Sequence, residues 1–127
     1  LVKHLRINWK EGEKYFRNCL LDFNEANNVA QWQWVAGCGA DAAPYFRIFN
    51  PILQGEKFDK QGDYVKKWVP ELSKVPPKFI HKPWEMEKKY QEAINTIIGS
   101  DYPMPIVIHE KARADALSAF QSIKKKN

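Results

Sequence analysis

The chain has 127 residues, a hydrophobic content of 44% and a formal net charge of +5. This length and composition are sufficient for one domain with a packed core, and the short apolar runs exclude a membrane-spanning helix. The basic excess is compatible with a polyanionic partner such as nucleic acid and equally with plain solubility.

Helical periodicity begins early in the chain. Residues 11–21 carry apolar side chains three and four positions apart, which predicts an amphipathic helix. Its apolar side is expected to contain Tyr15, Phe16, Cys19 and Leu20. Residues 24–31 are rich in side-chain amides, which favours a loop, although residues 25–34 are equally compatible with a short buried helix. Gly37 and Gly39 then end the pattern.

Three further helical stretches follow in the second half of the chain. Residues 61–72 are predicted to be helical with a kink or an early end at Pro70, and residues 84–98 and 111–124 also have helix-like apolar spacing. The prolines of residues 73–83 predict irregular structure. The expected apolar sides are Tyr64, Val65, Trp68 and Val69 in the first stretch and Ala112, Ala116, Phe120 and Ile123 in the last.

The pattern therefore predicts an all-α class with long connecting loops, because neither an alternating strand nor a repeat is visible. Loops of this length are unusual in a free-standing compact domain. The chain also begins at Leu1 and not at a methionine. From these two observations we expect a piece of a longer protein.

The cysteines and histidines suggest no chemical site. Cys19 and Cys38 lack the spacing of metal ligands, so we expect two reduced thiols and no metal. His4, His81 and His109 are scattered along the chain, and none of them has neighbours that make a catalytic group.

The segment from residue 22 to residue 51 combines amides with aromatic rings, including Trp32 and Trp34 two positions apart. A buried amide without a partner costs about 1–3 kcal/mol, whereas a buried ring needs flat apolar contact. Both together suit a flat ligand with polar edges, such as a fused heteroaromatic ring or a nucleobase. Ordinary core packing is the alternative interpretation.

Longer motifs extend this signal over almost the whole chain. They are residues 9–17 (WKEGEKYFR), 21–24 (LDFN), 28 (N), 32–34 (WQW), 41–51 (DAAPYFRIFNP), 54–59 (QGEKFD), 68–72 (WVPEL), 81–84 (HKPW) and 102–107 (YPMPIV). In this order they resemble the DNA photolyase/cryptochrome family and, more narrowly, the class I cyclobutane pyrimidine dimer photolyases of bacteria. The resemblance implies that residues 1–127 are the C-terminal portion of a helical FAD-binding domain. The N-terminal α/β domain and the upstream part of the FAD-binding domain are then absent.

The resemblance also implies a site for FAD. Asp22, Phe23, Asn24 and Asn28 are expected to bind the flavin, with Asn28 opposite its N5 atom. A side-chain amide can donate or accept a hydrogen bond there. The family commonly has Asp where this chain has Asn24, so a negative charge near the flavin is lost. A folate or deazaflavin antenna pigment would belong to the absent N-terminal domain.

Two further sets of residues follow from the resemblance. Trp9 and Trp32 correspond to two of the three tryptophans that relay electrons to the flavin, and the third would lie upstream. Trp34 corresponds to the aromatic side chain that stacks on a pyrimidine dimer flipped out of DNA. The residues expected to contact the substrate or its phosphates are Arg47, Gln54 and Lys57.

The activity implied is that of a deoxyribodipyrimidine photo-lyase, which splits cyclobutane dimers by light-driven electron transfer from reduced FAD. The partner is then DNA that contains pyrimidine dimers, and we expect a cytoplasmic bacterial monomer with no membrane association. The isolated fragment is expected to be inactive. Alternatives are a cryptochrome photoreceptor, a (6-4) photolyase, and a small basic helical module that binds nucleic acid without a cofactor.

Overall fold

The computed structural model describes residues 1–40 and 47–124, so most of the 41–51 motif lies outside the described part. The chain divides into two compact units, Leu1–Ile48 with Val107–Asn127, and Phe49–Ile106. Within the described ranges the structure contains helices and turns and no strand, apart from an isolated bridge between Ile98 and Tyr102. The predicted all-α class is confirmed.

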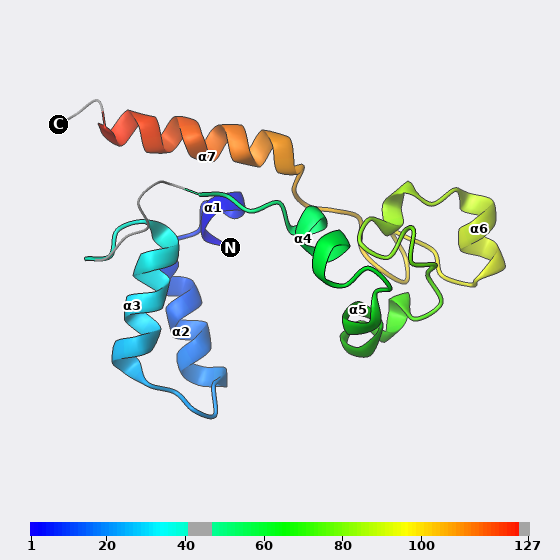
Figure 1. Ribbon diagram of the computed structural model, residues 1–127, viewed down its shortest axis with the longest axis horizontal. Coiled ribbons are helices and arrows are strands. Elements are labelled where there is room, and N and C mark those ends of the chain that lie inside the picture. Colours follow the sequence, from blue (N-terminus) through cyan, green and yellow to red (C-terminus); the bar gives the residue numbers. More distant parts are fainter. Residues whose placement is uncertain (41–46, 125–127) are drawn as a thin grey trace. The chain divides into compact units, whose positions relative to one another are not determined.

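The described part of the first unit contains four helices (Figure 1). They are α1 (Val2–Leu5), α2 (Trp9–Cys19), α3 (Glu25–Ala36) and α7 (His109–Lys124). α2 and α3 form an antiparallel hairpin, and α1 packs against both α3 and α7. The first and last helices of the chain are therefore neighbours, which the order of the sequence does not reveal.

Side-chain caps define the ends of the helical hairpin. The side chain of Asn8 accepts a hydrogen bond from the backbone N–H of Lys10 at 3.1 Å, and that of Asn24 accepts one from Asn27 at 3.0 Å. Asparagine is among the best residues at this position because it satisfies an otherwise unpaired N–H of the first turn. α3 ends at Gly37, whose φ of 77° is the left-handed conformation that glycine adopts without strain.

The second unit contains α4 (Pro51–Phe58), α5 (Asp63–Trp68), η1 (Pro70–Leu72), η2 (Pro83–Glu85) and α6 (Lys88–Ala93). Its helices are short, and turns connect most of them. The buried core consists of Leu72, Val75, Ile80 and Met86. The predicted irregular structure of residues 73–83 is confirmed, as is the early end near Pro70, since α5 stops at Trp68.

The prediction of a loop at residues 24–31 is wrong, and the alternative prediction of a helix within residues 25–34 is confirmed. α3 begins at Glu25 because Asn24 acts as its N-cap, so an amide that suggested a loop in fact starts a helix. α1 and α4 are additional helices that no pattern had predicted.

The expected apolar side of α2 is also wrong. Its four members, Tyr15, Phe16, Cys19 and Leu20, are all exposed in the structure, and the buried position is Gly12. A Cβ atom at Gly12 would lie 2.1 Å from Cη2 of Trp32. The helices approach each other at this glycine, so the ring of Trp32 occupies the space where a larger residue of α2 would lie.

The long helix expected over residues 84–98 is reduced to the six residues of α6. Gln91 explains this, because its side chain donates to the carbonyl of Met86 at 2.7 Å and accepts from the N–H of Ile98 at 2.9 Å. These bonds satisfy backbone groups on both sides of a short helix. Asn95, with a φ of 53°, then turns the chain out of the helical conformation.

Two other expected apolar sides are only half correct. Val65 of α5 and Val69, the residue after it, pack on the core, whereas Tyr64 and Trp68 are 68% and 62% exposed. In α7 the alanines at 112 and 116 are buried, whereas Ile123 is exposed. None of the helices in the described part of the chain has both the length and the apolar composition needed to span a bilayer.

Candidate functional site

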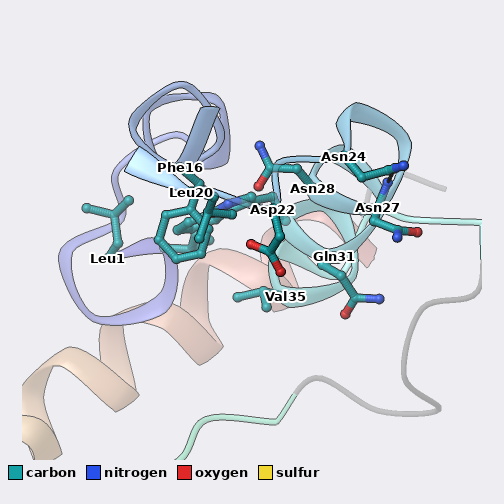
Figure 2. Close-up of a pocket in the computed structure, with 11 residues that line it drawn as sticks. Leu1, Phe16, Leu20, Asp22, Asn24, Asn27, Asn28, Gln31 and Val35 are labelled. Atoms are coloured by element: carbon teal, nitrogen blue, oxygen red, sulfur yellow. Dashed lines mark hydrogen bonds between the residues drawn. The ribbon is translucent and has the colours of Figure 1, made fainter. Parts of the chain in front are cut away.

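A cavity of about 530 Å³ lies in the first unit, beside the α2–α3 hairpin (Figure 2). Its lining residues are Leu1, Val2, Phe16, Leu20, Asp22, Asn24, Asn27, Asn28, Gln31, Trp32 and Val35. Figure 2 shows that the amides come from α3, whereas Leu1, Phe16 and Leu20 lie opposite them. Pockets of this size that combine apolar sides with a few polar groups are typical of small-molecule sites.

Helical spacing produces the polar side of the cavity. Asn24, Asn27, Asn28 and Gln31 stand at positions i, i+3, i+4 and i+7, and residues at these intervals share one face of a helix. Asp22, in the turn before α3, adds one carboxylate. The cavity therefore presents donors, acceptors and one negative charge to a ligand with a polar edge.

Asn28 is the only buried residue of α3 and is 7% exposed. Its side-chain nitrogen donates to the backbone oxygen of Glu13 at 3.0 Å and to Oε1 of the same residue at 3.1 Å. Both partners are acceptors, so the nitrogen and not the oxygen must lie on this side. The Oδ1 atom then remains available to a ligand in the cavity.

The carboxylate of Glu13 is 12% exposed and also accepts from Arg17 at 2.9 Å. The same guanidinium nitrogen lies 2.9 Å from the carboxylate of Glu25. The hydrogen bonds that Arg17 donates, first to Glu25 and then to Glu13, raise the pKa of its guanidinium. These contacts connect both helices of the hairpin to the amide of Asn28.

Trp32 contributes an aromatic ring to the cavity and packs over Gly12. Its ring meets that of Phe16 edge to face at a centroid distance of 5.1 Å, which is a favourable geometry for aromatic pairs. Trp9 is half-buried at the start of α2 and does not line the cavity. The two tryptophans thus belong to adjacent, packed helices.

The structure brings together four of the predicted site residues, namely Asp22, Asn24, Asn28 and Trp32. Phe23 is half-buried outside the cavity lining, and the guanidinium of Arg17 lies 5.3 Å from its ring centroid. Trp34 is 40% exposed near the end of α3, which leaves its ring accessible to a partner.

The remaining predicted residues, Arg47, Gln54 and Lys57, are not among those that line this cavity. The backbone oxygen of Arg47 accepts a hydrogen bond from the side chain of Lys3 in the first unit. Gln54 and Lys57 belong to α4 of the second unit, where Lys57 is exposed and lies 5.0 Å from the ring centroid of Phe58. Each of these residues is accessible or partly accessible within its own unit.

Sequence reasoning missed several residues of the site. Asn27 and Gln31 could have been found from their spacing relative to Asn24, and the Glu13–Arg17 pair from its interval of four. No sequence signal pointed to the pairing of His4 and His109, whose ring nitrogens lie 2.9 Å apart. In the described ranges, no group of three or more metal-ligating side chains is present, and both cysteines are free thiols.

Comparison with known proteins now identifies the family. Residues 1–122 match the family model described as the FAD binding domain of DNA photolyase, and the chain belongs to this family. A deoxyribodipyrimidine photo-lyase from Agrobacterium fabrum is 58% identical over 125 residues, which is 98% of this chain and 26% of that protein. The chain spans about a quarter of the length of the curated relatives it matches.

Two solved structures are similar to this chain. A class III photolyase from Agrobacterium tumefaciens has a TM-score of 0.91 at 58% identity, over 98% of this chain and 26% of its own. A cryptochrome from Synechocystis has a TM-score of 0.85 at 35% identity, over 92% of this chain and 24% of its own. The motifs of residues 9–107 thus predicted the family correctly.

Proposed function

We propose that this chain provides part of the FAD site of a deoxyribodipyrimidine photo-lyase, an enzyme of light-dependent DNA repair. The observation that carries the proposal is the cavity in which Asp22, Asn24, Asn28 and Trp32 meet. Its residues fit a flavin, because a fused heteroaromatic ring offers flat apolar faces and a polar edge. The family match supports the same ligand.

The bound flavin supplies the light-driven electron transfer to the substrate. In the proposed site, Asn28 accepts a hydrogen bond from a ligand N–H through Oδ1, because its nitrogen is already occupied by Glu13. Asp22 and Asn24 bind further polar groups of the cofactor. Trp32 covers an apolar part of the ligand, and Trp9 on the neighbouring helix passes electrons toward it. Phe23 is proposed to support the cofactor-binding turn.

The proposed substrate is a cyclobutane pyrimidine dimer in DNA. Trp34 is exposed, as a residue that stacks on a flipped-out base must be. Arg47 and Lys57 supply positive charge for phosphates, and Gln54 supplies hydrogen bonds. A dependence of binding on salt concentration follows from the phosphate contacts.

The test uses the full-length protein that contains this chain. After purification its flavin content is measured, and DNA with defined thymine dimers is then incubated with it under reducing conditions, in blue light and in the dark. The proposal predicts one FAD per chain and loss of dimers only in the light. Trp34→Ala should weaken dimer binding by about 1–3 kcal/mol, the range measured for one base stacked on an aromatic ring. A matched control is Trp68→Ala, which removes an exposed ring from the second unit.

A cryptochrome-type photoreceptor is the second candidate, because the Synechocystis structure called a cryptochrome is also similar to this chain. It predicts a bound flavin that responds to light without any loss of dimers. A (6-4) photolyase predicts repair of that lesion instead. Parallel assays of repair on cyclobutane dimers and on (6-4) lesions distinguish both alternatives from the proposed function.

The remaining expectations extend this proposal to the whole protein. We propose that it acts as a cytoplasmic monomer, with a folate or deazaflavin antenna bound outside residues 1–127. The isolated chain is expected neither to retain FAD tightly nor to repair DNA. Stoichiometric flavin on the isolated chain would contradict this expectation.

A further inference from the structure

Arg17 connects the two helices of the hairpin through a single nitrogen atom. Its Nη2 atom lies 2.9 Å from Oε1 of Glu13, one turn earlier on α2, and 2.9 Å from Oε1 of Glu25 at the start of α3. The Glu25 side chain is largely exposed, whereas that of Glu13 is largely buried. The two ion pairs of Arg17 therefore differ in exposure to solvent. Only the pair with Glu13 contacts a residue that lines the cavity, Asn28.

The Oε1 atom of Glu13 accepts hydrogen bonds from two side chains at once. One comes from Arg17 at 2.9 Å and the other from Nδ2 of Asn28 at 3.1 Å. An ionised carboxylate is only an acceptor, so it holds the nitrogen of the neighbouring amide toward itself. A charged group this far from solvent also requires a partner, which Arg17 provides.

We infer that Arg17 is a positioning residue for the ligand of the cavity, since it holds the Glu13 carboxylate against Asn28 and so helps to direct Oδ1 of Asn28 to the ligand. This inference rests on the proposed function, in which the ligand is FAD. Without Arg17, the Glu13 carboxylate is free to turn toward solvent. The amide of Asn28 then keeps only its hydrogen bond to the backbone oxygen of Glu13, so it is held less firmly and presents N–H to the cavity more often.

The consequence concerns the reduction of the flavin. N5 of an oxidised flavin is an acceptor, whereas N5 of the reduced flavin carries a hydrogen. An amide oxygen opposite N5 therefore stabilises the reduced form, and an amide N–H stabilises the oxidised form. Loss of Arg17 should consequently make the flavin harder to reduce.

The experiment measures the midpoint potential of the flavin in the full-length protein. Arg17→Met should decrease the equilibrium constant for reduction about two- to fivefold, which is the usual range for one partly exposed ion pair. Arg17→Lys retains the charge and should restore most of this loss. Glu25→Ala is the matched control, because it removes the other ion pair of Arg17 and leaves the Arg17–Glu13 contact in place.

A second pair of proteins, in which Glu13 is also replaced, distinguishes the positioning effect of Arg17 from the direct effect of its positive charge on the flavin. In a Glu13→Ala protein, Arg17→Met should no longer change the potential, because the side chain that links Arg17 to Asn28 is already removed. An equal decrease in both backgrounds would overturn the inference, since Arg17 would then act through its charge alone. An unchanged potential in Arg17→Met with the native Glu13 would overturn it as well.

A measurement that needs no flavin tests the role of Arg17 independently of the proposed function. In protein labelled with ¹⁵N-asparagine, the side-chain N–H₂ of Asn28 should exchange slowly with solvent and should exchange faster in Arg17→Met. Wild-type protein that takes up no FAD would refute the proposed function and leave this exchange test valid. Equal exchange in both proteins would refute the inference while FAD binding stands.

Discussion

The side-chain nitrogen of Asn28 donates both of its hydrogens to one residue, Glu13, at 3.0 Å to the backbone oxygen and 3.1 Å to the carboxylate. This contact joins the first turn of α3 to the middle of α2. Among the amides that line the cavity, Asn28 is the one that is buried. The pair therefore contributes to stability and sets the chemistry of the site at the same position.

Replacement of Asn28 by Asp should destabilise the protein by about 1–3 kcal/mol. The change removes two donated hydrogen bonds and brings a second carboxylate to Glu13, so that buried acceptors lose their partner. Urea unfolding followed by circular dichroism measures the effect. Asn27→Asp is the control, because Asn27 is exposed on the same helix and its replacement should change stability little. Equal losses in the two variants would contradict the explanation.

Gly12→Ala should also destabilise the hairpin, by about 1–3 kcal/mol, which is typical of overpacking. The new Cβ would lie 2.1 Å from the ring of Trp32, so the ring or the helix must move. The better helix propensity of alanine opposes this by no more than about 1 kcal/mol. Thermal unfolding measures the change, and adding Trp32→Phe should recover part of it. A Gly12→Ala protein as stable as the wild type would show that the ring moves without strain.

Two substitutions of Asn24 test its role as the N-cap of α3 separately from the effect of charge at this position. Asn24→Ala should cost about 0.5–2 kcal/mol, because the bond to the N–H of Asn27 is lost. Asn24→Asp should retain full stability, since Asp caps equally well and favours a helix N-terminus. If FAD binds in the cavity as proposed, the same Asp should make the flavin harder to reduce, because it adds a negative charge to the cavity lining. If Asp and Ala were equally destabilising, the cap would not be the reason.

The contact of His4 with His109 predicts a loss of stability in mild acid. Burial lowers the pKa of His4, and the positive charge of His109 lowers it further. Above the ordinary histidine pKa of about 6.5, His4 is neutral in both the folded and the unfolded state. As the pH falls below that value, the unfolded chain binds a proton that the folded chain resists, so stability decreases.

Unfolding experiments at intervals between pH 7.5 and about pH 5 measure this dependence, in the range where histidine titrates. His4→Gln should make the decrease shallower, because the residue with the lowered pKa is gone. The variant is expected to remain folded, since its amide can still form a hydrogen bond with His109. A decrease of the same steepness in wild type and variant would assign the acid sensitivity to other groups.

The sequence alone determined the family and the helical class of this protein. Local order was sufficient for both: the motifs around Trp9, Asn28 and Trp32 lie within short stretches, and helical spacing is a property of neighbours. It also placed Asp22, Asn24 and Asn28 in one segment. Even so, the amides of that segment favoured a loop, because the same side chains serve turns and helix caps.

Only the tertiary structure decided which residues oppose one another. Periodicity shows which side chains share a face of α2, but it does not show that α3 approaches this helix at Gly12 and leaves Phe16 exposed. The direction of the Asn28 amide depends on Glu13, 15 positions away in the chain. The contact between His4 and His109 spans 105 positions. Such contacts arise from the packing of whole helices, and no local pattern encodes them.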